Sequence, residues 1–199
     1  MLINRSGFRL FAEYDLGDAL SAQLKKAVNE ISQKEIDCEN SKSFIESYLK
    51  EITIERLILD SEAVTARMEK AMIPAEYFPG TFMTDRGNSY EKPIAVFSVP
   101  FTGDKQLFNS RPSTFMMWSE EVAIEGNNLV FEIIVFSEDA DKIKVERDGI
   151  ISKINQQLVN INNQVDAYNA SLPKNITDIV NAECKKRSSE SDLLSKLNS

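Results

Sequence analysis

Asp104 and Arg111 flank a turn near the middle of the sequence, where an acidic and a basic side chain could together bind a ligand or a partner protein. The turn is Thr102-Gly103-Asp104, in which Gly tolerates a positive φ and Asp can hydrogen-bond its own turn. The two charged side chains could also pair and fix the shape of the loop. We therefore take Phe101, Thr102, Gly103, Asp104 and Arg111 as a candidate interaction loop, while a structural Asp turn with an exposed Arg explains the same residues.

Histidine is absent from the sequence. Neither a Ser-His-Asp triad nor a Cys-His pair can form, and there is no imidazole to bind zinc or to act as a general base near neutral pH. Asp60, Glu62 and Glu69 lie close together in the sequence, but their spacing does not match a metal-binding loop. We therefore predict a protein that is not an enzyme, with no catalytic residue, no metal site and no cofactor.

The overall composition excludes several classes of partner. The net charge of −8 disfavours nucleic acid as a partner of this chain, because phosphate binding requires clustered Lys and Arg. No apolar run approaches the length of a transmembrane helix, and the first residues lack the apolar stretch of a signal peptide. Cys38 and Cys184 lie far apart with no CxxC partner. These features predict no membrane association and a cytoplasmic protein with two reduced thiols, with a disulfide between them as the alternative.

The loop must be held in place by an antiparallel sheet. Apolar, β-prone residues and Gly-Asn between two such runs predict strands and a hairpin. The alternation over 64–73 favours a further half-buried strand, with a helix as the alternative. Before the sheet, apolar stripes predict two helices, one over 18–31 capped by Asp18 and one starting at Ser41 or Ser43. We expect the strands of one antiparallel sheet near 52–59, 93–99, 121–125 and 129–136.

The last third of the sequence has a helical pattern. Its apolar positions 150, 154, 158, 161, 165, 168 and 172 form one stripe. Pro173 is expected to end this helix and a second one to begin near Asn175, which gives a long C-terminal helical hairpin. The sequence thus predicts an α+β fold with a sheet domain over 1–136 and a helical hairpin over 137–199 packed on it, or one single domain. The stripe residues taken as a candidate partner surface are Ile154, Leu158, Ile161 and Val165, with a role in the core as the alternative.

Two parts of the sequence carry a family resemblance. Val99-Pro100-Phe101-Thr102-Gly103-Asp104, Leu107-Phe108 and Arg111-Pro112-Ser113-Thr114-Phe115 resemble the N-terminal region of a bacterial family. The helical stretches Asn162-Asn163-Gln164-Val165, Tyr168-Asn169-Ala170-Ser171-Leu172 and Lys185-Lys186-Arg187 resemble the same region. The resemblance covers the chain from about residue 90 onward. In that family the region precedes a restriction-endonuclease-like domain with an Asp…Glu-x-Lys metal site.

The nuclease motif of that family is not carried onto any residue here. Glu183-Cys184-Lys185 matches Glu-x-Lys only superficially, because it lies in a predicted helix rather than on a strand. The resemblance implies a non-catalytic N-terminal module of a nuclease-like bacterial protein, acting in regulation, sensing or oligomerisation, with defence as a candidate process. The alternative is a free-standing scaffold that binds a partner through its apolar helix stripe. In both cases we expect a protein partner or a homo-oligomer.

Overall fold

The computed structural model describes residues 2–3, 5–114 and 116–198. Phe115, the last residue of the motif that carries the family resemblance, lies outside the described residues. The elements in chain order are β1 (Phe8–Arg9), β2 (Tyr14–Asp15), α1 (Leu16–Gln33), α2 (Ser41–Ile52), β3 (Ile58–Leu59), β4 (Thr65–Pro74), the short 3-10 helix η1 (Ala75–Tyr77), β5 (Ser89–Thr102), the 3-10 helix η2 (Lys105–Asn109), β6 (Ser110–Arg111), β7 (Glu121–Glu125), β8 (Asn128–Ile134) and α3 (Ala140–Leu197). The predicted α+β class is confirmed.

The sheet is antiparallel throughout, with strand order β1-β7-β8-β5-β3, and β4 also pairs with β5. The predicted hairpin is present between β7 and β8, and Gly126 in its turn has a φ of 62°. The stretch over 64–73 is a strand, as favoured, and β5 at the centre is longer than predicted. A separate parallel pair joins β2 to β6.

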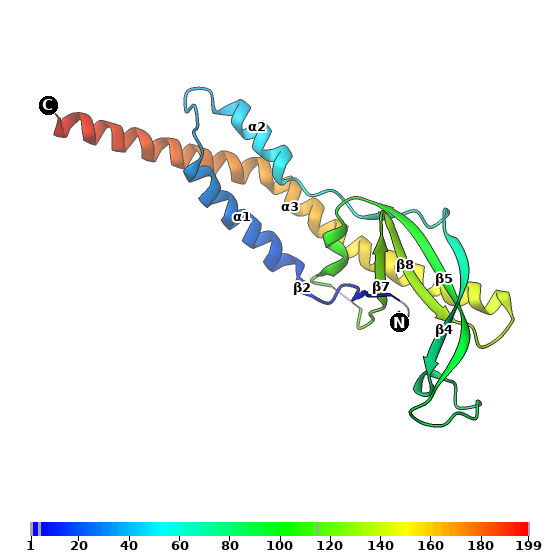
Figure 1. Ribbon diagram of the computed structural model, residues 1–199. Helices are drawn as coiled ribbons and strands as arrows, with labels where there is room; N and C mark the ends of the chain where they lie inside the picture. Colours follow the sequence, from blue (N-terminus) through cyan, green and yellow to red (C-terminus); the bar gives the residue numbers. More distant parts are fainter. Residues whose placement is uncertain (1, 4, 115, 199) are drawn as a thin grey trace.

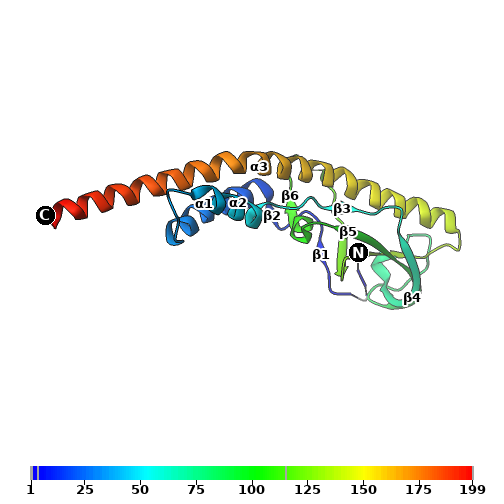
Figure 2. The same cartoon turned by 90° about the horizontal axis from the view of Figure 1, so that it is seen from above.

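The prediction of a C-terminal helical hairpin is wrong. Residues 140–197 form one helix of 58 residues that continues through Pro173 (Figures 1 and 2). Proline inside a helix removes a backbone hydrogen bond and costs about 3 kcal/mol. The helix continues because Leu172, Ile176 and Val180, on either side of the proline, are all buried against α1 and α2. Pro173 itself is exposed. The helix α3 is gently curved, and its convex side faces away from the elements that it covers, as is usual for a helix with one side in water (Figure 2).

The expected strand over 52–59 is also largely wrong. Ile52 is the last residue of α2, and only Ile58–Leu59 pairs with β5. Likewise α1 begins earlier than predicted, with Asp15 rather than Asp18 as its N-cap. Between α2 and β3 the backbone of Ile54 and of Leu57 bonds to the side chains of Asn169 and Asn162 of α3 in place of a neighbouring strand.

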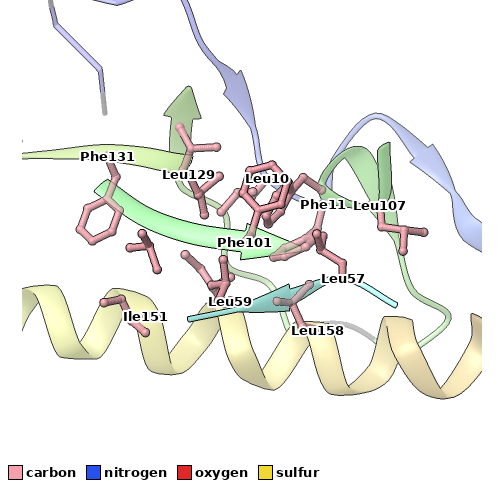
Figure 3. Packing of buried hydrophobic residues seen from close by; sticks show 14 of the residues in the cluster. Leu10, Phe11, Leu57, Leu59, Phe101, Leu107, Leu129, Phe131, Ile151 and Leu158 are labelled. Carbon is pink, nitrogen blue, oxygen red and sulfur yellow. The ribbon is translucent and has the colours of Figure 1, made fainter. Parts of the chain in front are cut away.

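The helix α3 contributes to two hydrophobic clusters. Its first half packs under the sheet with Phe97, Phe131 and Leu129, and Figure 3 shows Ile151 and Leu158 of α3 facing this layer. Its second half packs with Ile31 of α1 and Tyr48 of α2. The two predicted ranges, 1–136 and 137–199, therefore share their hydrophobic cores. A third, smaller cluster covers the opposite face of the sheet.

Candidate interaction surfaces

The predicted interaction loop is tied to the core by its aromatic residues. Phe101 and Phe108 are buried and meet edge to face with ring centroids 5.1 Å apart. Gly103 has a φ of 94°, and a Cβ atom there would lie 1.8 Å from the carbonyl oxygen of Arg56. The position therefore requires glycine both for its backbone conformation and for the close approach of the two chain segments. Phe101 and Gly103 serve the fold, and Thr102 remains exposed.

The two charged residues of the loop have separate structural contacts. The Asp104 carboxylate accepts the Gln106 N–H at 2.9 Å and caps η2. Arg111 is exposed and lies in β6, opposite Asp15 of β2. A hollow of about 400 Å³ does lie between the loop and α1, with Asp104, Gln106, Leu107, Tyr14, Leu20 and Gln23 among its lining residues. The polar groups in it hold the fold together, because the Tyr14 hydroxyl donates to the Gln106 carbonyl and the Gln23 amide to that of Ile52.

The predicted partner stripe on α3 is core. Ile154, Ile161 and Val165 are fully buried and Leu158 is 4% exposed, all in the cluster beneath the sheet. Their use as a surface for a partner is therefore wrong, and the alternative of a core role is confirmed. The partner prediction failed because an apolar stripe has the same pattern whether it meets a sheet of its own chain or another molecule.

Amide side chains on the flanks of α3 hold two irregular segments, and sequence reasoning missed them. Asn162 accepts the Leu57 N–H at 3.1 Å and donates to the Leu57 carbonyl at 2.9 Å. Asn169 does the same for Ile54, at 3.2 and 2.8 Å, and Asn155 donates to the hydroxyl of Ser61. These three asparagines are spaced by seven residues and so lie on one face of the helix. The spacing was visible in the sequence as a signal for this row.

A second row of amides binds the segment after β6. Gln164 accepts the Ser113 N–H at 3.2 Å, Asn160 donates to the Thr114 carbonyl at 2.9 Å and Gln157 to that of Met116 at 3.3 Å. Unpaired backbone groups in such segments would each cost about 1–3 kcal/mol when buried. The helix α3 is thus the element to which both irregular segments are attached.

A network of charged residues lies on the sheet face opposite α3. Arg5 donates to Glu69 at 2.5 Å, to Glu125 at 2.8 Å and to the buried Glu132. Arg67 adds a contact to Glu69 at 2.8 Å. The hydrogen bond from Arg5 is the main cause that lowers the pKa of Glu69, and the hydrogen bond from Arg67 lowers it further. The same Arg5–Glu69 hydrogen bond raises the pKa of Arg5. The Ile3 N–H also donates to Glu132 at 2.7 Å, so the network fixes the N-terminal segment on the sheet.

Cys38 and Cys184 form a disulfide with their Cα atoms 5.5 Å apart, which corrects the predicted reduced thiols. The bond joins the loop between α1 and α2 to α3. Beside it, Arg187 of α3 donates to the carbonyls of Ser32 and Lys34, at the end of α1. Cysteines separated by 146 residues give no sequence signal for pairing, because only the fold brings them together.

We expect reduction of this disulfide to lower the free energy of unfolding by about 2–4 kcal/mol, since the bond restricts the unfolded chain. Urea denaturation with and without a reductant measures the effect, and a Cys38→Ser variant should show no response to the reductant. Alkylation of both thiols in the folded, unreduced protein would contradict the pairing.

Within the described ranges, no group of three or more Cys, Asp or Glu side chains could hold a metal ion. Nor does any described helix contain a stretch that is both long and apolar enough to cross a membrane.

Comparison with protein-family models, curated proteins and solved structures finds no significant match for this chain.

The strand β4 is a candidate surface because it has exposed apolar residues. Among the described residues, the only strand that pairs with β4 is β5. Two large apolar side chains on it, Met68 and Met72, are 60% and 57% exposed. Methionine is enriched at protein–protein interfaces. We take β4 as the candidate interaction surface in place of the loop and the helix stripe.

Proposed function

We propose that this chain is a non-catalytic protein-interaction module that associates through β4, at its exposed residues Met68 and Met72. The observation that carries the proposal is the ten-residue strand with Met68 and Met72 exposed. The contrast with the predicted loop supports it, because the charged and polar groups there are engaged in caps, turns and backbone contacts. The resemblance of the sequence from about residue 90 onward suggests a module of a nuclease-like bacterial protein, with regulation, sensing or oligomerisation as its role.

A second candidate is a free-standing scaffold that binds a partner through α3. The stripe beneath the sheet is buried, but the last turns of α3 extend beyond α1 and α2 (Figure 1). There Leu193, Leu194 and Leu197 are exposed. The coding sequence after Ser199 distinguishes the two candidates. A strand-borne Asp…Glu-x-Lys motif favours the module, and a stop codon favours the scaffold.

The cytoplasmic location is also part of the proposal. The Cys38–Cys184 bond argues against it, because disulfides persist mainly in oxidising compartments. Trapping the thiols with an alkylating reagent at the moment of cell lysis would distinguish a cytoplasmic protein, whose thiols are alkylated, from one in an oxidising compartment, whose disulfide is intact.

We expect no cleavage when the purified chain is incubated with plasmid DNA and Mg²⁺ or Mn²⁺. The physical reason is that the described carboxylates do not converge on a common metal position. Gel electrophoresis of the plasmid measures the outcome. Metal-dependent cleavage that is abolished by one carboxylate substitution would overturn the non-catalytic half of the proposal.

A further inference from the structure

The disulfide between Cys38 and Cys184 is open to solvent on one side. Cys38 is exposed in the loop that joins α1 to α2, whereas Cys184 on α3 is half-buried. Exposed disulfides are generally labile, while those that only stabilise a fold resist reduction by cellular thiols. Because Cys38 is exposed, a thiol reductant can approach the bond while the chain is folded.

The loop that carries Cys38 meets α3 at the disulfide and at one neighbouring side chain. Arg187 of α3 donates to the carbonyls of Ser32 and Lys34, at 3.1 and 3.0 Å. Inside the loop, the Asp37 carboxylate accepts the N–H groups of the two residues after Cys38, which orders the turn without attaching it to α3. The disulfide is therefore the covalent link between α3 and the segment that leads into α2.

The start of α2 is weakly held. The helix has 12 residues, and its buried residues, Tyr48 and Ile52, lie in its second half. In the first half, Phe44 and Ile45 are only partly buried. Within the described ranges, the N-cap Asn40 makes no side-chain hydrogen bond that caps the helix. Since a helix of this length is marginal on its own, the first half of α2 depends on the loop that precedes it.

The end of α2 is held by contacts that do not involve the disulfide. The Tyr48 hydroxyl donates to Glu30 of α1 at 2.7 Å, and the Ile52 carbonyl accepts from the Gln23 amide at 3.2 Å. Figure 2 shows α1 and α2 on the same side of α3, whose residues complete the cluster around Tyr48 and Ile52. The two ends of α2 thus differ, because only its start is close in sequence to a bond that can be broken by reduction.

We propose that the Cys38–Cys184 bond is a redox switch that locks the start of α2 against α3, and that its reduction releases the loop and the first half of α2. This switch is independent of the association through β4. In the oxidised form, Phe44 and Ile45 help to cover the cluster to which α3 contributes. In the reduced form, the apolar surface beneath them becomes accessible.

The switching step is a thiol–disulfide exchange with a thiol reductant of the glutathione class. The thiolate of the reductant attacks the Cys38 sulfur, a mixed disulfide forms there, and Cys184 leaves as a thiolate that takes up a proton. A second reductant thiolate then attacks the reductant sulfur of the mixed disulfide, so that Cys38 leaves and is protonated in turn. The chain gains two electrons and two protons, and the reductant becomes its own disulfide.

Hydrogen exchange measured by mass spectrometry, with and without an excess of reduced glutathione, tests the switch in the folded protein. The amides of residues 45–48 bond to the first turn of α2 and report its opening. We expect them to exchange at least about ten-fold faster after reduction, close to the rate of an unfolded chain. The amides of β8 should stay protected, because the core of the sheet remains folded.

Two variants in the exposed loop separate the bond from other effects of the reductant. Cys38→Ser should give the exchange pattern of the reduced parent without any reductant and should not respond to glutathione. Glu35→Ser, at another exposed position of the same loop, should behave as the parent does.

Three results would overturn the switch. They are a bond that survives excess reduced glutathione in the folded protein, amides of residues 45–48 that keep their protection after reduction, and a loss of protection that occurs there only together with β8. The association through β4 is measured by sedimentation, so its failure is distinguishable from that of the switch.

Discussion

Arg5→Met should lower the free energy of unfolding by about 3–5 kcal/mol, because it leaves the buried carboxylate of Glu132 without its charge partner. Glu132 is 5% exposed, and the guanidinium of Arg5 lies against it and against Glu69 and Glu125. A loss of this size is a large fraction of the stability of an ordinary domain. Equilibrium urea denaturation followed by circular dichroism provides the measurement.

Two further variants identify the cause of that loss. Arg5→Met combined with Glu132→Gln should be more stable than Arg5→Met alone, because glutamine is neutral and still offers an acceptor to the Ile3 N–H. Arg86→Met, at an exposed arginine, should change the stability by less than about 0.5 kcal/mol. If the double variant were the less stable one, the buried charge would not be the cause.

Leu158→Ala should lower the free energy of unfolding by about 2–5 kcal/mol through the cavity that it leaves beneath the sheet. Leu158 lies between α3 and the layer formed by Leu57, Leu59 and Phe101 (Figure 3). Because the contact is within one chain, the loss should be the same at every protein concentration. Denaturation curves at several concentrations measure both quantities.

The neighbouring residue is the matched control for this variant. Val159 is 58% exposed on the same turn of α3, so Val159→Ala should have little effect. A loss for Leu158→Ala that grows on dilution would show that the stripe meets a second copy, contrary to its burial in the cluster beneath the sheet.

The sheet was largely predictable from the sequence. The β7–β8 hairpin and the central strand have β-prone residues with a Gly-Asn turn, and these signals are local. The turn at Gly103 and the inward position of Phe108 were likewise visible. What these patterns left open is whether the charged side chains of the loop face a ligand, because that depends on neighbours such as Arg56 that lie far away in the sequence.

The errors share a different cause. Pro173 is a reliable local signal for the end of a helix, but burial of Leu172, Ile176 and Val180 against two other helices outweighs it. The pairing of Cys38 with Cys184 and the binding of Leu57 by Asn162 depend on contacts between distant segments. The exposure of Met68 and Met72 on β4 was not predictable either, since periodicity identifies a strand without showing which of its sides has a neighbour.

The most direct test of the proposed association through β4 is sedimentation velocity of the purified chain from about 1 to about 300 micromolar. The parent is compared with a double variant, Met68→Lys and Met72→Lys, which places charges at the two exposed apolar positions of β4. Leu193→Lys, at an exposed position near the end of α3, is the matched control. We predict association of the parent and of the control that the double variant lacks, whereas a parent that stays monomeric throughout, or association that the double variant keeps, would contradict it.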